Sequence, residues 1–156
     1  MDDAARVDLS VVVPLYNEKD NLAELHQQLV QALDPLGRPF ELVLVDDGSR
    51  DGTREALVEL ERCDPRVRAV LLRRNFGQTA AFSAGFERSR GAIVVTSDGD
   101  LQNDPRDIPA LVAKLDEGFD MVCGWRRKRH DSWSRILPSW VANGLISMIE
   151  RTSGKR

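Results

Sequence analysis

Short runs of β-branched residues alternate with helix-length segments along this chain, and this alternation constrains the fold more than any other feature. Runs of this length and composition are typical of buried strands, and the segments between them suit helices. The predicted strands are Leu9–Pro14, Phe40–Val45, Val67–Leu72, Ile93–Ser97 and Met121–Gly124. The predicted helices are a first one that includes residues 21–33, followed by Thr53–Arg62, Thr79–Arg88 and Pro105–Glu117.

This order of elements predicts an α/β fold. Strands separated by helices form a mostly parallel sheet with helices on both faces, as in doubly wound domains. A chain of 156 residues has the size of one such domain. Its composition, 42% hydrophobic and 30% charged, is that of a globular protein and not of a disordered one.

The first helix carries the clearest periodic pattern. Asn21 followed by Glu24 resembles a capping box at its start. Four leucines are predicted to share its buried face, namely Leu22, Leu25, Leu29 and Leu33. Pro35, Gly37 and Pro39 then end the helical pattern.

Polar residues follow four of the predicted strands. They are Tyr16–Glu18, Asp46–Ser49, Arg74–Asn75 and Asp98–Asp100, in chain order. Ligands of open α/β sheets bind at the carboxyl ends of the strands, so we expect these groups to lie together in one site.

The turn after the first strand reads PLYNEKDN and contains no glycine. A dinucleotide-binding domain would carry GxGxxG here, so a nicotinamide or flavin cofactor is disfavoured. Tyr16 instead offers a ring that can stack on a base, and Glu18 a carboxylate that can bind a base or a ribose. The alternative for Tyr16 is ordinary packing.

The second strand ends in VDDGSRDGT, with Asp46 and Asp47 adjacent. A turn explains most of this segment, with Ser49 or Asp51 capping the next helix. A turn needs only one of the two aspartates, so their other predicted role is to accept hydrogen bonds from a nucleotide.

The segment TSDGDLQNDP places Asp98 and Asp100 directly after the fourth strand. Two carboxylates around a glycine can direct oxygen ligands into one space, and oxygen ligands select hard cations such as Mg²⁺ or Mn²⁺. Such a cation would stabilise a departing diphosphate as a Lewis acid. A DxD sequence on its own is also common in plain turns.

Charge is distributed unevenly around a formal net value of −3. Residues 124–156 contain eight Lys or Arg and two acids, whereas the preceding residues contain 14 and 23. A basic tail on an acidic body indicates that the tail meets an anion, which could be a phosphate, an acidic lipid or nucleic acid.

The tail also has a predicted amphipathic helix. Its apolar residues are Trp133, Leu137, Trp140, Leu145 and Met148. Arg135, Ser139 and Asn143 recur every fourth residue and would form a polar stripe beside that face, suited to an anionic headgroup on an apolar chain. The alternative is an ordinary amphipathic helix with solvated charges.

Several features predict a location in the cytosol. The only two cysteines, Cys63 and Cys123, are far apart, so neither a disulfide framework nor a zinc site is expected. The N-terminus lacks the basic start and long apolar run of a signal peptide. No apolar stretch reaches the roughly 20 residues of a membrane-spanning helix.

In their order, three motifs resemble family 2 glycosyltransferases of the GT-A fold, a Rossmann-like single domain. They are PLYNE at Pro14–Glu18, VDDGS at Val45–Ser49 and DGDLQ at Asp98–Gln102. Two further segments, Arg74–Gly85 and Gly124–Ser139, are similar to the polyprenyl-phosphate glycosyltransferases. That group includes dolichol-phosphate mannose synthases and undecaprenyl-phosphate sugar transferases. The resemblance covers nearly the whole chain.

The resemblance implies a role for each matching residue. The nucleoside would be held by Pro14, Tyr16, Glu18, Asp46 and Asp47. The metal and diphosphate group would be Asp98, Asp100 and Gln102. Arg126 would approach the diphosphate, although Arg127 or Arg129 also fits that place, and Arg135 and Ser139 would lie near the lipid phosphate. The implied catalytic residues are Asp98, Asp100, Arg126 and Arg135.

The implied activity is inverting transfer of a sugar from a UDP- or GDP-sugar to a polyprenyl phosphate, with Mg²⁺ or Mn²⁺, at the cytoplasmic face of the cell membrane. A phosphate oxygen is already ionised and needs no general base, whereas a hydroxyl acceptor would need one. No recognisable acceptor-side aspartate follows Asp104. The alternatives are a family 2 enzyme with a hydroxyl acceptor and a noncatalytic remnant that binds nucleotide or membrane. No nucleic-acid partner is expected, and the motifs carry no signal for an oligomeric state.

Two parts of one domain are expected. Residues 1–124 would form the core that binds nucleotide-sugar and metal, and residues 125–156 a basic loop and an amphipathic helix on the acceptor and membrane side. Because the resembling enzymes continue further, we expect a truncation that preserves donor binding and impairs turnover. A signalling receiver domain is a rival of the same fold class, but it needs its acidic pair after the first strand, where this chain has YNE.

Overall fold

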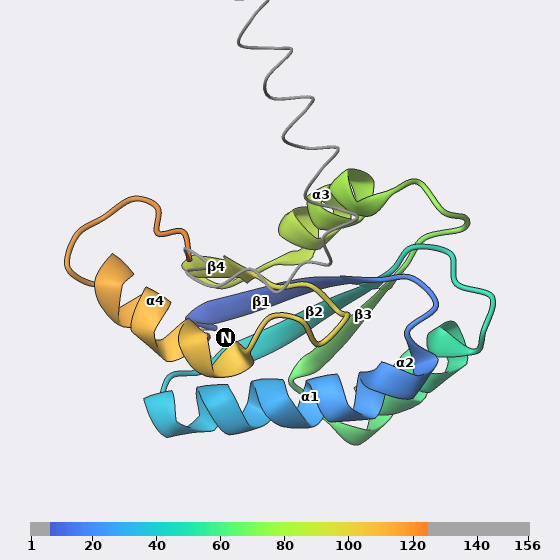
Figure 1. Cartoon of the computed structure of the whole chain (residues 1–156), viewed down its shortest axis with the longest axis horizontal. Helices are drawn as coiled ribbons and strands as arrows, with labels where there is room; N and C mark the ends of the chain where they lie inside the picture. The colour runs from blue at the N-terminus through green and yellow to red at the C-terminus, as the bar shows by residue number, and fades with distance from the viewer. Residues whose placement is uncertain (1–6, 125–156) are drawn as a thin grey trace, which may run out of the picture. The chain divides into compact units, whose positions relative to one another are not determined.

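A parallel sheet of four strands forms the centre of the protein (Figure 1). The computed structural model describes residues 7–124. The described residues up to Val122 belong to one compact unit. The strands are β1 (Leu9–Leu15), β2 (Phe40–Asp46), β3 (Val67–Leu71) and β4 (Ile93–Thr96). They are arranged in the order β3-β2-β1-β4, with every neighbouring pair parallel. The predicted α/β fold with a mostly parallel sheet is confirmed.

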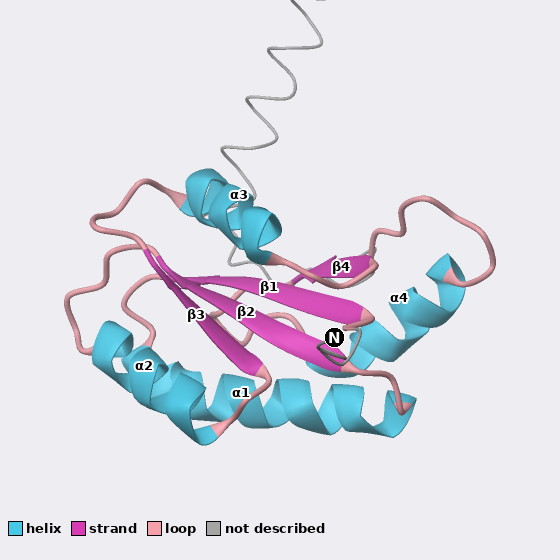
Figure 2. Cartoon of the chain, turned by 180° about the vertical axis from the view of Figure 1, so that it is seen from behind, coloured by secondary structure: helices cyan, strands magenta, loops and turns pink. Residues whose placement is uncertain are grey.

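Helices cover both faces of the sheet, as Figures 1 and 2 show from opposite sides. They are α1 (Lys19–Leu33), α2 (Thr53–Cys63), α3 (Gln78–Arg88) and α4 (Ile108–Leu115), with the 3₁₀ turns η1 (Asp34–Leu36) and η2 (Pro105–Asp107). One face packs against α1, α2 and α4, and the other against α3. None of the helices between residues 7 and 124 has the length and apolar character needed to span a membrane.

Strand side chains alternate between two apolar cores. In β1, Val11 and Val13 join the core beneath α1, whereas Val12 joins the core beneath α3. In β2, Leu44 and Val45 divide in the same way. This period of two is the geometry of a pleated strand, and it explains why a strand buried on both faces reads as a continuous apolar run.

The apolar face of α1 is as predicted, but its N-terminus is not. Four leucines of that face are buried, Leu22, Leu25, Leu29 and Leu33. The helix begins at Lys19, so Asn21 lies inside its first turn and the predicted capping box is wrong. The N–H group of Glu18 donates to the Thr53 hydroxyl at 2.9 Å, and that of Lys19 donates to the Asp51 carboxylate at 3.1 Å. Side chains at the start of α2 therefore accept the N–H groups that a helix leaves unpaired at its N-terminus.

Two other predicted elements differ. Met121–Gly124 is not a strand, because these residues have no pairing partner in the described part of the chain and Met121 is 77% exposed. The helix predicted from Pro105 to Glu117 is divided into η2 and the shorter α4. The Asp104 side chain accepts the N–H of Arg106 at the start of η2, and Gly118 adopts a φ of +105° soon after α4 ends.

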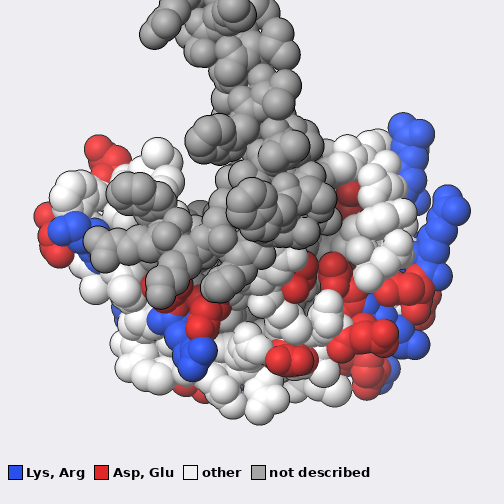
Figure 3. All heavy atoms as spheres, in the orientation of Figure 1, with Lys and Arg blue, Asp and Glu red and all other residues white. Residues whose placement is uncertain are grey.

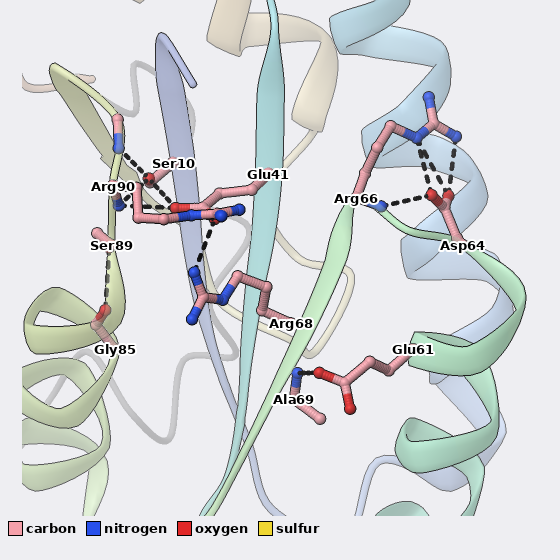
Figure 4. A network of polar contacts seen from close by, with 11 residues as sticks. Ser10, Glu41, Glu61, Asp64, Arg66, Arg68, Ala69, Gly85, Ser89 and Arg90 are labelled. Carbon is pink, nitrogen blue, oxygen red and sulfur yellow. Dashed lines mark hydrogen bonds and ion pairs between the residues drawn. The ribbon is translucent and has the colours of Figure 1, made fainter. Parts of the chain in front are cut away.

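A buried carboxylate ties the amino ends of β1 and β2 to the segment before β4. Glu41 is 1% exposed and accepts hydrogen bonds from the Ser10 hydroxyl and the Arg90 N–H, both at 2.7 Å. The Arg90 guanidinium lies 2.7 Å from the other carboxylate oxygen, and Figure 4 shows these side chains turned toward one another. Burial raises the pKa of Glu41, but the bonds from Ser10 and Arg90 outweigh it and the pKa is lowered.

The strand order creates a topological switch point at the carboxyl ends of β1 and β4. From β1 the chain moves outward through β2 to β3, and then crosses back to β4 on the other side of β1. Connections on the two sides of such a point lie on opposite faces and leave a crevice at the carboxyl ends of its two strands. A ligand is therefore expected between the ends of β1 and β4.

Candidate active site

A cavity of about 450 Å³ opens at this switch point. Its walls come from the end of β1, the residue after β2, the start of α3 and the segment after β4. The lining residues are Pro14, Leu15, Tyr16, Glu18, Asp47, Asn75, Gly77, Gln78, Asp98, Gly99 and Asp100. The structure thus brings together six residues predicted for the site: Pro14, Tyr16, Glu18, Asp47, Asp98 and Asp100.

Four loops at the carboxyl ends of the strands build the cavity. We call residues 16–18 the first loop, 47–52 the second, 72–77 the third and 97–104 the fourth. Figure 3 shows Asp and Glu side chains gathered on the side of the molecule where these loops lie, with Lys and Arg side chains projecting beside them.

The first loop presents an aromatic ring and a carboxylate to the cavity. Tyr16 is 45% exposed and lines the cavity, so it is not part of the core and its ring is available to a ligand. The Glu18 carboxylate is half-buried and accepts a bond of 2.7 Å from the Asn21 side-chain amide. The bond holds Glu18 at the cavity wall and leaves acceptor capacity on its second oxygen.

The second loop holds the first loop in place. The Asn17 N–H donates to the Ser49 hydroxyl, and the side-chain Oδ1 of Asn17 accepts from the Arg50 N–H, both at 2.9 Å. Asn17 needs this support because its φ is +56°. Asp51 accepts from Lys19 and Thr53, and the Thr53 hydroxyl chiefly lowers the pKa of Asp51. Ser49 and Asp51 thus support the first loop, and the N-cap of α2 is Gly52 rather than either of them as predicted.

Asp46 has a structural role and does not line the cavity. It is fully buried, and its carboxylate accepts from the Ser49 N–H and the Arg54 side chain, both at 3.1 Å. Arg54 continues to the Leu72 carbonyl, so this pair connects the second and third loops. Of the two aspartates predicted to hold the nucleoside, the structure therefore places Asp47 at the cavity but not Asp46.

Asp47 reaches the cavity wall but uses both carboxylate oxygens within the protein. It is 3% exposed, and its two oxygens accept the N–H groups of Phe76 at 2.8 Å and Gly77 at 2.9 Å. Gly77 is the N-cap of α3 and has a φ of +94°. Asp47 thus fixes the point where the third loop becomes α3.

Close packing also joins the second and third loops. Gly48 has a φ of +72°, and a Cβ atom on it would lie 2.3 Å from the backbone carbonyl carbon of Arg74. Only glycine satisfies both conditions, because a side chain would be strained and would also strike the backbone.

The fourth loop carries the acidic motif. Asp98 accepts bonds from the Gln78 amide at 2.9 Å and the Asn103 amide at 2.7 Å, one on each carboxylate oxygen. Asp100 is exposed and accepts the N–H of Gln102 at 3.0 Å. Gly99 packs against β1, where an added Cβ would lie 2.6 Å from Leu15 Cδ2 and 3.0 Å from the Pro14 oxygen. The small residue lets both carboxylates reach the end of β1.

Leu101 anchors the acidic motif to the apolar core. Its φ is +59°, a conformation that costs a residue with a large side chain about 1–2 kcal/mol. The side chain packs against the main core beneath α1, and this contact offsets the cost. The turn that exposes Asp100 is therefore anchored by an apolar contact.

The donor chemistry of Asp98 and Asp100 fits a hard divalent cation. Each carboxylate oxygen has two acceptor positions, so the amide bonds to Asp98 leave room for a metal ligand. Residues 7–124 contain no group of three or more His, Cys, Asp or Glu that could enclose a metal. Mg²⁺ and Mn²⁺ suit such an open site, since one or two carboxylates are completed by diphosphate oxygens and water.

Gly77 and Gln78 line the cavity but had no role in the sequence-based prediction, whereas Asn75 was expected at the site as part of Arg74–Asn75. Their signal was present, because they belong to the polar segment after the third strand. Arg73 and Arg74 lie beside them with their guanidinium groups 5.9 and 4.7 Å from the centre of the Phe76 ring. The segment therefore adds the amides of Asn75 and Gln78 to the cavity wall.

Other predicted residues lie elsewhere. Gln102 is exposed and does not line the cavity, although its N–H orients Asp100. Five residues assigned to the diphosphate or the acceptor phosphate lie outside the described residues, namely Arg126, Arg127, Arg129, Arg135 and Ser139. The predicted amphipathic helix also lies outside them.

Solved structures share this architecture. The mannosyltransferase PcManGT from Pyrobaculum calidifontis, in complex with GDP-Man and Mn²⁺, aligns with a TM-score of 0.63 and 28% identity. The alignment covers 80% of this chain and 37% of that one. S. aureus TarS 1-349, in complex with UDP-GlcNAc, aligns with a TM-score of 0.61 and 26% identity over 79% and 37% of the two chains. The predicted GT-A fold is thereby confirmed.

Sequence comparison gives a closer relative. The undecaprenyl-phosphate 4-deoxy-4-formamido-L-arabinose transferase of Edwardsiella ictaluri (strain 93-146) is 49% identical over 148 residues. The match covers 94% of this chain and 45% of that protein, so the chain spans less than half the length of this curated relative. The model of the glycosyl transferase family 2 matches residues 10–155. This match excludes the receiver domain, and the chain belongs to glycosyl transferase family 2.

Proposed function

We propose that this chain carries the donor site of a metal-dependent, inverting glycosyltransferase that moves a sugar from a nucleotide-sugar to a polyprenyl phosphate. The observation that carries the proposal is one cavity that joins an aromatic ring and a carboxylate from the first loop to the acidic motif of the fourth. A nucleotide-sugar needs both chemistries, one at its base and one at its diphosphate.

The nucleoside is assigned to the β1 side of the cavity. Tyr16 stacks on the base, while Glu18 accepts hydrogen bonds from the base or the ribose. Pro14 supplies apolar wall, and Asp47 contributes mainly by holding the third loop. The structural neighbours bound to GDP-Man and UDP-GlcNAc support a donor of this class.

The diphosphate is assigned to the fourth loop. Asp98 and Asp100 hold the Mg²⁺ or Mn²⁺, Gln102 orients Asp100, and Arg126 supplies positive charge to the diphosphate. Bound there, the cation supplies Lewis-acid stabilisation of the leaving nucleoside diphosphate. The neighbour that contains Mn²⁺ supports a divalent ion.

A phosphate oxygen is the proposed nucleophile, and Arg135 and Ser139 are assigned to it. The oxygen attacks the anomeric carbon while the bond from that carbon to the diphosphate oxygen breaks on the opposite face, which inverts the configuration. No proton has to be removed, because the attacking oxygen is ionised at neutral pH. The 49% identical undecaprenyl-phosphate sugar transferase supports this acceptor. Because the proposed acceptor is a lipid, we also propose that the reaction occurs at a membrane surface, on its cytoplasmic face.

The acceptor is tested by paired substrates. The full chain is incubated with UDP- and GDP-sugars, Mn²⁺ and detergent-dispersed undecaprenyl phosphate, with undecaprenol as the matched hydroxyl acceptor. Mass spectrometry, which detects product after even slow turnover, is expected to find a glycosylated lipid phosphate and no glycosylated undecaprenol. Transfer to undecaprenol would establish a hydroxyl acceptor instead. Nucleotide binding without transfer to either lipid would favour the noncatalytic alternative.

A further inference from the structure

The amide of Gln78 forms a contact between the start of α3 and the acidic motif. Gln78 is the first residue of α3 and lines the cavity. Its Nε2 atom lies 2.9 Å from Asp98 Oδ1. The other oxygen, Oδ2, lies 2.7 Å from Nδ2 of Asn103. Both oxygens of Asp98 are therefore held by neutral amides that come from different segments of the chain.

The position of Gln78 is itself fixed from the end of β2. The Asp47 carboxylate holds the N–H groups of Phe76 and Gly77, the two residues before Gln78. Because Asp47 is 3% exposed and bonded through both oxygens, the start of α3 has little freedom to move. The contacts thus run from Asp47 through the backbone to Gln78 and from Gln78 to Asp98.

A neutral amide suits this place for a chemical reason. It donates a hydrogen bond to a carboxylate at every pH, and it brings no positive charge that would repel a cation. A carboxylate held in this way keeps its remaining acceptor positions pointed in a constant direction. Residues that orient a metal ligand typically change metal affinity by about 10–100-fold when they are replaced.

We propose that Gln78 is a positioning residue for the cation site, which orients Asp98 so that its free acceptor positions face the cavity. The inference rests on the proposed function, because it takes Asp98 as a metal ligand. It adds the first residue of α3 to the cation site of the fourth loop.

The test compares Gln78→Met with Gln28→Met in the full chain. Methionine keeps the length of glutamine and removes its donor. Gln28 provides the matched control, because its amide donates a 2.9 Å bond to Glu24 on the far helix α1. Electron paramagnetic resonance measures Mn²⁺ affinity with GDP or UDP present, and calorimetry measures nucleotide affinity in EDTA.

Gln78→Met is expected to weaken Mn²⁺ binding by roughly tenfold or more. Nucleotide affinity in EDTA and the thermal unfolding midpoint should remain those of the parent, and Gln28→Met should match the parent throughout. Unchanged Mn²⁺ affinity in Gln78→Met, with a parent that binds Mn²⁺, overturns this inference alone. A parent that binds no Mn²⁺ with either nucleotide overturns the proposed function as well. Gln78→Ala answers the same question if the methionine variant does not fold.

Discussion

Asp47 accepts a hydrogen bond of 2.9 Å from the backbone N–H of Gly77, and this bond joins the end of β2 to the start of α3. The two residues are 30 positions apart in the sequence. The bond shows that one of the two adjacent aspartates shapes the cavity by holding the chain that forms its wall. Asp46 also stabilises these loops, because its carboxylate accepts hydrogen bonds from the Ser49 N–H and the Arg54 side chain.

Removal of the Asp47 carboxylate tests this structural role. In Asp47→Ala the N–H groups of Phe76 and Gly77 lose a charged acceptor that is only 3% exposed. We expect a loss of roughly 3 kcal/mol in the free energy of unfolding, measured by urea denaturation, because bonds to charged groups contribute about 1.5–3 kcal/mol each. Glu87→Ala, an exposed change on α3, should stay within about 0.5 kcal/mol of the parent. Equal stability of both variants would show that Asp47 holds nothing in place.

A pair of glycines separates backbone strain from packing. Gly37 and Gly48 both have positive φ, +62° and +72°, but only Gly48 has backbone atoms where a Cβ would lie. Gly37→Ala should cost about 1–2 kcal/mol from conformation alone. Gly48→Ala should cost roughly 1–3 kcal/mol more, because it also pushes against Arg74. Urea denaturation measures both, and similar losses would mean that the second and third loops are not tightly packed.

Tyr16 is predicted to act on the nucleotide and not on stability. Tyr16→Ala should weaken GDP or UDP binding roughly tenfold, since base–aromatic stacking contributes about 1–3 kcal/mol. The unfolding midpoint should change little, because Tyr16 is 45% exposed. Phe119→Ala removes an aromatic ring of similar exposure, 51%, that does not line the cavity, and calorimetry should find its nucleotide affinity unchanged. Unaltered affinity in Tyr16→Ala would remove the ring from the site.

Stability should decrease as the pH falls below about 5. The pKa of Glu41 is lowered in the folded state, and the Arg66 guanidinium holds the pKa of Asp64 well below its usual range. Such carboxylates bind protons more readily when unfolded, so acid favours unfolding, and the stabilisation is present above their unfolded pKa values. Urea denaturation between pH 7 and 3 should show this decline.

Glu41→Gln separates the contribution of Glu41 to that decline. The variant should lose roughly 1–2 kcal/mol at pH 7, because the bonds from Ser10 and Arg90 would no longer be made to a charged acceptor, while the half-exposed Arg90 side chain stays solvated. It should also lose less stability than the parent between pH 5 and pH 3, with the Asp64 contribution retained. A decline as steep as that of the parent would show that Glu41 titrates normally.

Most of the fold was predictable from the sequence, because periodicity reports burial directly. The runs at Leu9–Leu15 and Phe40–Asp46 are largely buried on both faces and are apolar apart from Ser10, Glu41 and Asp46. The boundaries that were wrong depend on contacts distant in sequence. The start of α1 is set by Thr53 and Asp51, more than 30 residues away, and no local pattern carries that information.

The segments that form the site were predictable from the sequence, but the role of each residue within them was not. The rule that ligands bind at strand ends brought Tyr16, Asp47 and Asp98 to one cavity. Two adjacent aspartates cannot be assigned from sequence, because the residue that faces inward depends on the twist and pleat at the end of β2. Gln78 was missed because an amide has no motif of its own and gains its role only from lying 2.9 Å from Asp98.

The most direct measurement is calorimetric titration of the full chain with GDP and with UDP, in Mn²⁺ and in EDTA, for the parent, Asp98→Asn and Asp100→Asn. The parent should bind one of the nucleotides more tightly in Mn²⁺ than in EDTA, because the acidic motif and the diphosphate would share the cation. Both variants should keep the binding seen in EDTA and lose the increase due to Mn²⁺. An increase that survives in both variants, or a parent that binds neither nucleotide, would contradict a cation site at the carboxyl end of β4.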